Sequence, residues 1–427
     1  MFTTSLTNQL PDDSLLSSSL LNSLASQNLF IQRKSKKTSA SGFVFSLLSS
    51  VIDGHSSFRD LSRNLSYYQH TTISRQAAHQ RINKYAVDFM KNVNANMLAE
   101  KFSQEFPRQS NSFKRILIED ASTVKMHKGN SGNFRACGDK EGSTAAFKLD
   151  FCYDLLSGEA VSNNFIAAHY NDKKAGAMLI DQHVKKGDLV LRDMGYYSQP
   201  AFRLIENKGA CWFSKIPTNV NITYKGKDFN ETLKTTKLDS MDIEVELGKD
   251  ATKVRLIACR ATPEQATQKR RKANQQAKNH GKTPRKAASL RNGWHIAITN
   301  VSKEQMKTQE MIDLYRLRWQ IENIFKAWKQ SVHLEKCFNK KSNIYHQQCL
   351  IEASLMLLIL TMKFVMKLQV KQSEWVSIFN IAISLMSYIR RLQKLDDLCL
   401  FDPDPREISM EKRKRPNLMK LAKKTLT

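Results

Sequence analysis

Residues 115–120 have the sequence Arg-Ile-Leu-Ile-Glu-Asp, and residues 188–193 have the sequence Asp-Leu-Val-Leu-Arg-Asp. Each stretch contains a short apolar run of the length of a buried strand, and each ends in an aspartate. Side chains alternate between the two faces of a strand, so Asp120 shares a face with Ile116 and Glu119 points to the opposite face. A carboxylate at the end of a buried strand is costly to keep without a function. The two stretches therefore predict a buried sheet whose strands end in functional aspartates.

The residues between these two stretches complete a mixed α/β unit. Residues 147–155 and 159–168 have strand patterns and are joined by a Ser-Gly pair at 157–158, which predicts a hairpin. Residues 172–186 have helical spacing, and Gly187 is suited to end that helix. The resulting order of strand, strand, strand, helix, strand predicts a mixed α/β fold.

The helix predicted from Thr308 to Leu334 carries the most distinctive side chains of the chain. On an ideal helix, Tyr315, Arg318, Glu322 and Lys329 fall within an arc of roughly 60°. The adjoining arc is apolar and is predicted to pack against the sheet; it contains Leu314, Leu317, Ile321, Ile324, Phe325 and Trp328. A carboxylate is thus flanked by an aromatic hydroxyl and two cations. The alternative is an ordinary surface helix with incidental pairing of its charges.

The net charge of +27 predicts a polyanionic partner, because self-repulsion of this size destabilises a compact chain. We expect nucleic acid and no membrane, since the longest apolar run, Leu355–Leu360, is far shorter than the roughly 20 residues that cross a bilayer. The N-terminus lacks the pattern of a secretory signal. The seven cysteines are scattered, which indicates reduced, mostly buried thiols in a cytosolic protein.

The patterns divide the chain into four parts. They are a loosely ordered lead-in at 1–42, a helical DNA-binding domain at 43–106, a mixed α/β domain at 112–335, and a helical C-terminal region at 340–427. The α/β domain contains a β-rich insertion at about 209–301, with strands predicted at Cys211–Ile216, Asp242–Leu247, Lys253–Arg260 and Trp294–Thr299. We expect the C-terminal region, which has a basic tail at 412–415, to mediate dimerisation or to contact DNA.

Within the N-terminal helical part, residues 72–81 resemble the second half of a helix-turn-helix. Ser74 is suited to cap a new helix, and polar side chains compatible with DNA follow it, beginning with Arg75. A small helical bundle whose polar face only meets solvent is the alternative.

A second candidate DNA contact interrupts the insertion. Residues 269–291 contain nine Lys or Arg residues and no acid. Such a run is typical of a solvated loop, and it is also suited to follow a phosphate backbone. Its first four residues, Lys269, Arg270, Arg271 and Lys272, are the candidate DNA contacts.

The three carboxylates of Asp120, Asp193 and Glu322 form the pattern that two-metal phosphoryl transfer requires. Two Mg²⁺ ions about 4 Å apart need anionic oxygens from several directions, which no single helix or strand supplies. One ion activates the attacking water or hydroxyl, and the other stabilises the leaving oxygen.

With these residues in place, the chain resembles the DDE-class insertion-sequence transposases, which have a ribonuclease-H-like core. It is similar to the branch marked by a Tyr-x2-Arg-x3-Glu-x6-Lys signature, which Tyr315, Arg318, Glu322 and Lys329 match in full. The resemblance covers roughly residues 45–335. Two departures concern the flanks of the aspartates: Ala-Ser at 121–122 replaces a commoner Ser-Thr or Gly-Thr pair, and a methionine at 194 replaces a frequent basic residue.

The resemblance implies roles for further residues. Tyr315, Arg318 and Lys329 would bind phosphates near the transposon end. Trp294 resembles a tryptophan that some relatives stack on a base flipped out of the duplex, although a place in the core of the insertion is an equal alternative. We interpret Trp319 and Trp328 as core residues.

The resemblance implies an enzyme that performs cut-and-paste DNA transposition. We expect two Mg²⁺ ions held by Asp120, Asp193 and Glu322, with Mn²⁺ as a substitute, and double-stranded DNA of the transposon ends and the target as partner. We also expect a homodimer assembled on DNA in the bacterial cytoplasm, associated with the nucleoid. Two alternatives stay open: a degenerate copy that represses transposition without catalysis, and a metal nuclease of the same fold that cuts without strand transfer. The terminal-repeat sequence and the use of a hairpin intermediate are not predicted.

Overall fold

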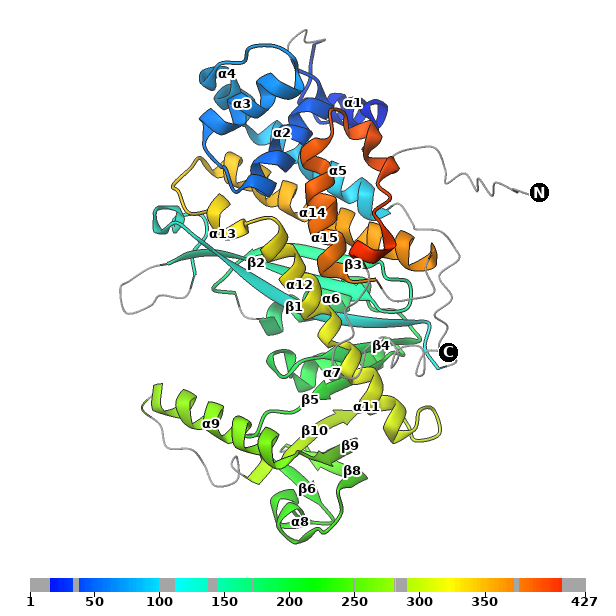
Figure 1. Cartoon of the computed structure of the whole chain (residues 1–427). Helices are drawn as coiled ribbons and strands as arrows, with labels where there is room; N and C mark the ends of the chain where they lie inside the picture. The colour runs from blue at the N-terminus through cyan, green and yellow to red at the C-terminus, as the bar shows by residue number, and fades with distance from the viewer. Residues whose placement is uncertain are drawn as a thin grey trace, which may run out of the picture.

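The computed structural model shows an elongated molecule with helices at one end, a sheet in the middle and a β-rich lobe at the other end (Figure 1). It describes residues 16–33, 38–99, 112–136, 144–170, 172–248, 250–279, 281, 290–371 and 376–408. The predicted basic tail, Cys137, Trp375 and most of 282–291 lie outside the described residues.

The middle of the molecule is a five-stranded mixed sheet. Its strands are β1 (Arg115–Met126), β2 (Ala145–Asp154), β3 (Ala160–Ala167), β4 (Asp188–Arg192) and β5 (Cys211–Lys215). The spatial order is β3-β2-β1-β4-β5, in which β1 is antiparallel to β2 and parallel to β4, and β4 is parallel to β5. This is the mixed α/β, ribonuclease-H-like arrangement that was predicted, and the fold class is confirmed.

Alternation along the strands separates two apolar layers, one on each face of the sheet. Leu117 and Val190 belong to the layer formed with helices α6 (Asp172–His183) and α7 (Gln199–Asn207). Ile118 and Leu191 belong to the opposite layer, which includes the helices after residue 308. The residues that follow these two pairs are therefore directed to defined faces.

Gly158 forms the predicted turn between β2 and β3, whereas the helix that we expected to run to residue 186 and to end at Gly187 already ends at His183. Gly158 has φ of +74° in the turn between β2 and β3, and Gly187 has φ of +89° just before β4. Both conformations lie in the left-handed region, which glycine adopts without steric cost. Gly158 therefore permits the hairpin, and Gly187 permits the turn that leads into β4.

The β-rich insertion continues the same sheet. Its elements are β6 (Ile222–Tyr224), β7 (Lys227–Asp228), α8 (Phe229–Thr235), β8 (Ser240–Leu247), β9 (Thr252–Arg260), α9 (Pro263–Asn279) and β10 (Trp294–Thr299). Because β10 is antiparallel to β5, the full sheet has ten strands in the order β3-β2-β1-β4-β5-β10-β9-β8-β6-β7. The strand at 211–215, which we had assigned to the insertion, is the fifth strand of the central sheet. The basic segment forms a helix up to Asn279, so the expectation of a loop was wrong for that part.

The long helix predicted from Thr308 to Leu334 is divided. It consists of α11 (Thr308–Leu317) and α12 (Trp319–Ser331), followed by the short α13 (Leu334–Cys337). The division falls at Arg318, where the backbone N–H of Arg318 donates to the Tyr315 carbonyl and that of Ile321 donates to the Arg318 carbonyl. These bonds span three residues, which tightens the turn as in a 3₁₀-helix. Helix α12 then crosses the sheet (Figure 1).

The helical end of the molecule is assembled from both ends of the chain. Its helices are α1 (Ser18–Gln27), α2 (Ala40–Asp53), α3 (Phe58–Tyr68), α4 (Arg75–Arg81), α5 (Lys84–Ala99), α14 (Ile344–Lys371), α15 (Ile378–Arg391) and α16 (Pro405–Ile408). Single 3₁₀ turns are η1 (Lys128–Asn130), η2 (Met194–Tyr196) and η3 (Leu395–Leu400). The N-terminal and C-terminal helical regions, which we expected to be separate, share one apolar core. The lead-in contains a formed helix, α1, whose Ser18 N–H donates to Asp396 at 2.9 Å.

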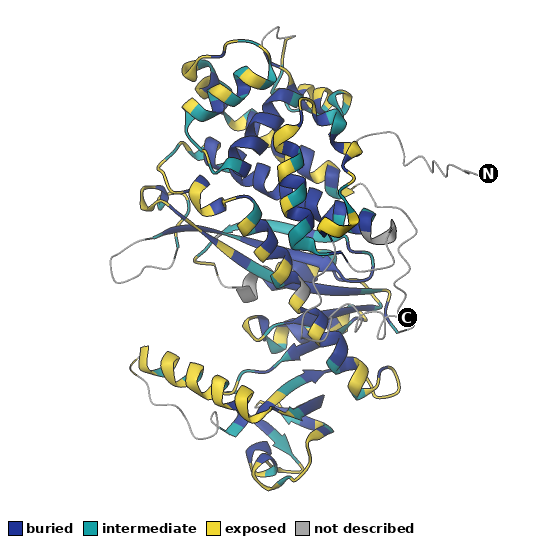
Figure 2. Cartoon of the chain, viewed as in Figure 1, coloured by how far each residue is buried: buried dark blue, intermediate teal, exposed yellow. Residues whose placement is uncertain are grey.

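Helix α14 lies at the centre of these helices. Residues 344–368 are long and apolar enough to cross a membrane, with mean hydropathy 2.0, and 94% of that window is buried inside the protein. Figure 2 shows the buried interior of the helical end in dark blue. The apolar character of α14 is thus explained by its place in the core.

Candidate active site

Three carboxylates from three different elements lie together at the carboxyl end of β4, next to the middle of β1. Asp120 lies within β1, Asp193 follows β4 directly, and Glu322 lies in the first turn of α12. Since β1 and β4 are parallel and pair Ile118 with Leu191, the two aspartates lie two residues further along at the same level of the sheet. The structure therefore brings together the three acids predicted as catalytic residues and metal ligands.

The guanidinium of Arg318 lies between the three carboxylates. Its Nη2 donates to Glu322 Oε1 at 2.8 Å and lies 3.6 Å from Asp193 Oδ1, and its Nη1 lies 3.6 Å from Asp120 Oδ2. The side chain of Arg318 is only 3% exposed, whereas that of Glu322 is 37% exposed. A buried cation thus holds together acids that solvent can reach.

The negative charges of the site affect one another. The pKa of the Asp120 carboxyl is raised to about 6, chiefly by burial and to a smaller extent by the negative charges of Asp193 and Glu322. The N–H of Ala121 and the cation of Arg318 act in the opposite direction. Arg318 and Lys215, whose Nζ lies 4.0 Å from Asp193 Oδ1, bring two positive charges against three carboxylates, so the site favours additional positive charge.

The acid next to Asp120 in sequence points away from this site. Glu119 is fully buried on the opposite face, where its carboxylate lies 3.4 Å from Arg192 Nη2. Helix α6 passes close to this pair at Gly176, where an added Cβ would lie 2.2 Å from Arg192 Nη2. The residues immediately before Asp120 and Asp193 thus form an ion pair beneath the site.

Tyr315 and Lys329 connect the helices to the strands that carry the aspartates. The Tyr315 hydroxyl donates to the Arg192 carbonyl at 3.1 Å, directly before Asp193, and the ring is buried. Lys329 Nζ donates to the Thr123 carbonyl of β1 at 2.6 Å. In this structure both side chains fix the position of α11 and α12 against the sheet.

Lys215 is a member of the site that the sequence interpretation missed. It is the last residue of β5, its Nζ lies 4.0 Å from Asp193 Oδ1, and it lies 5.4 Å from the centre of the Tyr315 ring. Burial lowers the pKa of Lys215. Its position at the end of a strand next to β4 would have identified it, had residues 211–215 been assigned to the central sheet.

The three tryptophans of interest differ in exposure. Trp294 is 4% exposed in the core of the insertion, with the Arg260 guanidinium 4.5 Å from its ring. Trp328 is buried as predicted, and its Nε1 donates to the Ser354 carbonyl at 2.8 Å. Trp319, predicted as a core residue, is 51% exposed beside Arg318, so that prediction was wrong. On an ideal helix Trp319 lies on the side opposite the apolar arc of Leu314, Leu317 and Ile321, so helical spacing itself accounts for its exposure.

The remaining candidate DNA contacts lie on helices α4 and α9, which do not carry the three acids. Arg75 is exposed at the start of α4, where Ser74 caps the helix as predicted by accepting from the Ala77 N–H. Arg270, Arg271 and Lys272 are exposed on α9, while Lys269 is half-buried and donates to the Trp294 carbonyl at 2.9 Å. In the basic helix α9, Lys269 is therefore bound to β10, whereas Arg270, Arg271 and Lys272 are exposed.

The donor set suits a divalent metal ion, although the carboxylates do not converge closely in this conformation. Among the described residues, no three His, Cys, Asp or Glu side chains are arranged to share one ion. The Arg318 guanidinium occupies the place between the carboxylates that a cation would take. Carboxylate oxygens from several elements are the ligands that Mg²⁺ prefers.

Comparison with known proteins agrees with this arrangement. Residues 111–359 match the family described as the transposase DDE domain. The chain is 28% identical over 352 residues to the transposase for insertion sequence element IS231E of Bacillus thuringiensis subsp. finitimus, covering 76% of this chain and 73% of the relative. It is 24% identical over 366 residues to the transposase for insertion sequence element IS1151 of Clostridium perfringens, covering 80% and 76%.

A structural comparison gives a weaker likeness. The piggyBac transposase synaptic complex with hairpin DNA aligns with a TM-score of 0.46 and 11% identity, over 97% of this chain and 82% of that chain. The family match carries the assignment, because it spans more than half of the chain and includes all three carboxylates. The chain belongs to the DDE transposases.

Proposed function

We propose that Asp120, Asp193 and Glu322 are the catalytic carboxylates of cut-and-paste transposition of an insertion sequence. The observation that carries this proposal is the meeting of three carboxylates, from two strands and a helix, around one buried guanidinium. The reaction is cleavage of DNA at the terminal inverted repeats, followed by transfer of the freed 3′ ends to target DNA.

DDE transposases use divalent metal ions. Two Mg²⁺ ions, for which Mn²⁺ substitutes, would be held by the three carboxylates and would supply charge neutralisation at the attacking and leaving oxygens. The protein's own cations act on the phosphates around the scissile bond. Arg318 presents a planar, bidentate donor, and Lys215 presents a point charge from the end of the neighbouring strand. Tyr315 holds the backbone before Asp193 in place through its hydrogen bond to the Arg192 carbonyl.

The DNA follows the basic surfaces that flank the site. Helix α4 with Arg75 contacts the terminal repeat, and α9 with Arg270, Arg271 and Lys272 contacts the same duplex from the insertion. Lys329 reaches the phosphate backbone beside Glu322. Two copies pair the two ends of the element as a homodimer on DNA, in the bacterial cytoplasm at the nucleoid. The net charge of +27 supports this extended contact with a polyanion.

The test is cleavage of a labelled duplex that carries the terminal repeat flanking the gene, in Mg²⁺ or in EDTA. Glu322→Gln keeps the volume of the side chain and removes its charge, so we expect cleavage to be lost while binding of the repeat is kept. The matched control is Glu244→Gln, an exposed acid of the insertion, which should cut like the wild type. Efficient cleavage by Glu322→Gln would refute the assignment. Binding without cleavage by the wild-type protein in every metal would favour a repressor.

A further inference from the structure

Helix α9 is unusual among the described helices because it projects from the insertion with little covering it (Figures 1 and 2). It has 17 residues, and Ala266 is its one buried residue. Its sequence contains five Lys or Arg residues and one acid, Glu264. A helix that is polar on nearly all sides does not contribute to a core, so its role lies at its surface.

One side of α9 is fixed to the insertion. Gln265 Oε1 lies 3.0 Å from His295 Nε2, and Lys269 Nζ donates to the Trp294 carbonyl at 2.9 Å. Lys269 Nζ also lies 3.2 Å from His295 Nδ1. The remaining residues of this side are small, since Ala273 and Ala277 follow Ala266 at helical spacing. Strand β10 therefore determines which side of α9 faces outward.

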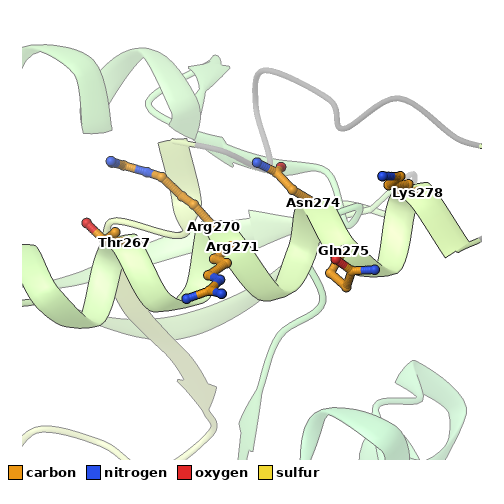
Figure 3. Close-up of a pocket in the computed structure, with 6 residues that line it drawn as sticks. All are labelled: Thr267, Arg270, Arg271, Asn274, Gln275 and Lys278. Atoms are coloured by element: carbon orange, nitrogen blue, oxygen red, sulfur yellow. The ribbon is translucent and has the colours of Figure 1, made fainter.

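The outward side of α9 carries amide, hydroxyl and cationic side chains, all of which can form hydrogen bonds with a partner. Six of them line a groove of about 450 Å³ (Figure 3): Thr267, Arg270, Arg271, Asn274, Gln275 and Lys278. On an ideal helix these six fall within an arc of roughly 140°. Gln275 Nε2 donates to Asn279 Oδ1 at 3.0 Å, a bond between exposed side chains that another partner could replace.

This combination matches the chemistry of base edges in the DNA major groove. Asparagine and glutamine form paired hydrogen bonds with adenine, and arginine and lysine do so with guanine. A surface that only binds phosphates needs cations alone, whereas here two amides stand between the cations. The major groove is roughly 12 Å wide and admits one helix, and 17 residues of helix span about 25 Å.

We propose that α9 lies in the major groove of the terminal repeat and recognises its base sequence through Asn274 and Gln275. Arg270, Arg271 and Lys278 contact guanine edges or the adjoining phosphates. The inference rests on the proposed transposase function. It assigns part of the sequence specificity to the insertion, in addition to helix α4.

The test measures discrimination between two duplexes by the full chain in EDTA, where cleavage does not interfere. The probes are a duplex with the terminal repeat flanking the gene and a duplex of the same composition with that sequence scrambled. The variant Asn274→Ala/Gln275→Ala keeps the net charge, and alanine strengthens a helix, so loss of binding would not reflect unfolding of α9. We expect the ratio of the two Kd values to fall at least about 10-fold, with the Kd for the scrambled duplex unchanged.

The matched control is a pair of neighbouring glutamines on different sides of the helix. Gln275→Ala should reduce discrimination, whereas Gln276→Ala should leave it as in the wild type, because Gln276 is turned away from the groove. Replacing single purines of the repeat by 7-deazapurines removes the N7 acceptor in the major groove. At the contacted bases, this replacement should weaken the wild type and have little further effect on the double variant.

The outcomes separate this inference from the proposed function. Two results would overturn the inference, because each would show that α9 does not recognise bases. In the first, the ratio of the two Kd values is the same for the double variant as for the wild type. In the second, the double variant binds both duplexes more weakly than the wild type and by the same factor. The proposed function stands in that case if the wild-type protein still cuts the repeat in Mg²⁺. If the wild-type protein neither prefers nor cuts the repeat, both fail.

Discussion

Arg318 is the residue on which the electrostatics of the active site depend. Its guanidinium is nearly inaccessible to solvent and contacts all three carboxylates, at distances between 2.8 and 3.6 Å. In the protein without bound metal or DNA, it therefore holds the acids in place. It also opposes the binding of another cation at the same position. The same residue can stabilise the site and set its affinity for metal.

Arg318→Gln should increase the affinity for Mn²⁺ several-fold, because a positive charge beside Asp120 and Asp193 is removed. Cleavage should fall by about 100-fold or more, because a donor to the phosphates is lost. Mn²⁺ binding is measured without DNA, by the electron paramagnetic resonance signal of the free ion. The control is Arg316→Gln, whose arginine pairs with Asp313 instead. Unchanged or weaker Mn²⁺ binding in Arg318→Gln would contradict this role of the guanidinium.

For single residues, the sequence predicted the position of a side chain where that position depends only on the alternation of side chains along one strand. Asp120 and Asp193 could be placed on one face of the sheet because each follows a short apolar run whose alternation sets its direction, although β1 continues past Asp120 to Met126. Lys215 could not be placed, because its surroundings depend on which strand pairs with β4. The helical spacing of Trp319, opposite the apolar arc of α11 and α12, did indicate exposure, and our interpretation of it as a core residue overlooked this. The pairing of β5 with β4 has no local signature in the residues themselves.

At the scale of elements, the sheet and α6 pack around the ion pair of Glu119 and Arg192. Both side chains are fully buried directly behind the site. Gly176 of α6 gives Arg192 the space that a larger residue would fill. The packing of one helix therefore supports the backbone that ends in the two aspartates.

Gly176→Ala should destabilise the protein by about 1–3 kcal/mol, since a Cβ would lie 2.2 Å from Arg192 Nη2 and 3.0 Å from Glu119 Oε1. This cost should exceed the gain of up to about 1 kcal/mol that alanine brings to a helix interior. The free energy of unfolding is measured by urea denaturation. Gly132→Ala is the control, because an added Cβ there meets nothing within 4 Å. Equal stability of the two variants would show that the space at Gly176 is not needed.

Most elements followed from sequence patterns, and the exceptions have physical causes. Helix α9 was missed because its polar residues give no apolar periodicity. Helix α1 was missed because its stability comes from packing against distant helices, including the contact between Ser18 and Asp396. Strand pairing between β5 and β10 joins segments far apart in the chain, and no local pattern encodes it.

At the scale of the whole molecule, the two ends of the chain form one helical unit. His346 of α14 stacks on Phe58 of α3, with ring centres 4.4 Å apart, and it is only 1% exposed. Its Nδ1 lies 2.8 Å from Ser342 Oγ, and His79 is the neighbouring titratable group. This contact joins the candidate DNA-binding helices to the centre of the C-terminal region.

Stability should therefore depend on pH through His346. Burial lowers the pKa of His346 to about 4, against an ordinary value of 6.5. Between these values the unfolded chain binds a proton that the folded chain does not, so stability is lost as pH falls from 6.5 towards 4, by up to about 3 kcal/mol. His346→Gln should show a smaller loss over this range in urea denaturation. The exposed His127→Gln should behave like the wild type, and an identical pH slope in all three proteins would exclude this contribution.

The continuous sheet also has a consequence for where the DNA is cut. Helix α9 is bonded to β10, β10 pairs with β5, β5 pairs with β4, and Asp193 directly follows β4. Because each step of this path is a pairing of adjacent strands or a hydrogen bond, we expect the separation between the outward side of α9 and the carboxylates to vary little. The protein would then fix the distance along the duplex between the contacted bases and the cut. On the proposals that α9 binds the terminal repeat and that the three carboxylates cut it, we expect the cut at a set number of base pairs from the bases contacted by α9, whatever the sequence at the junction itself.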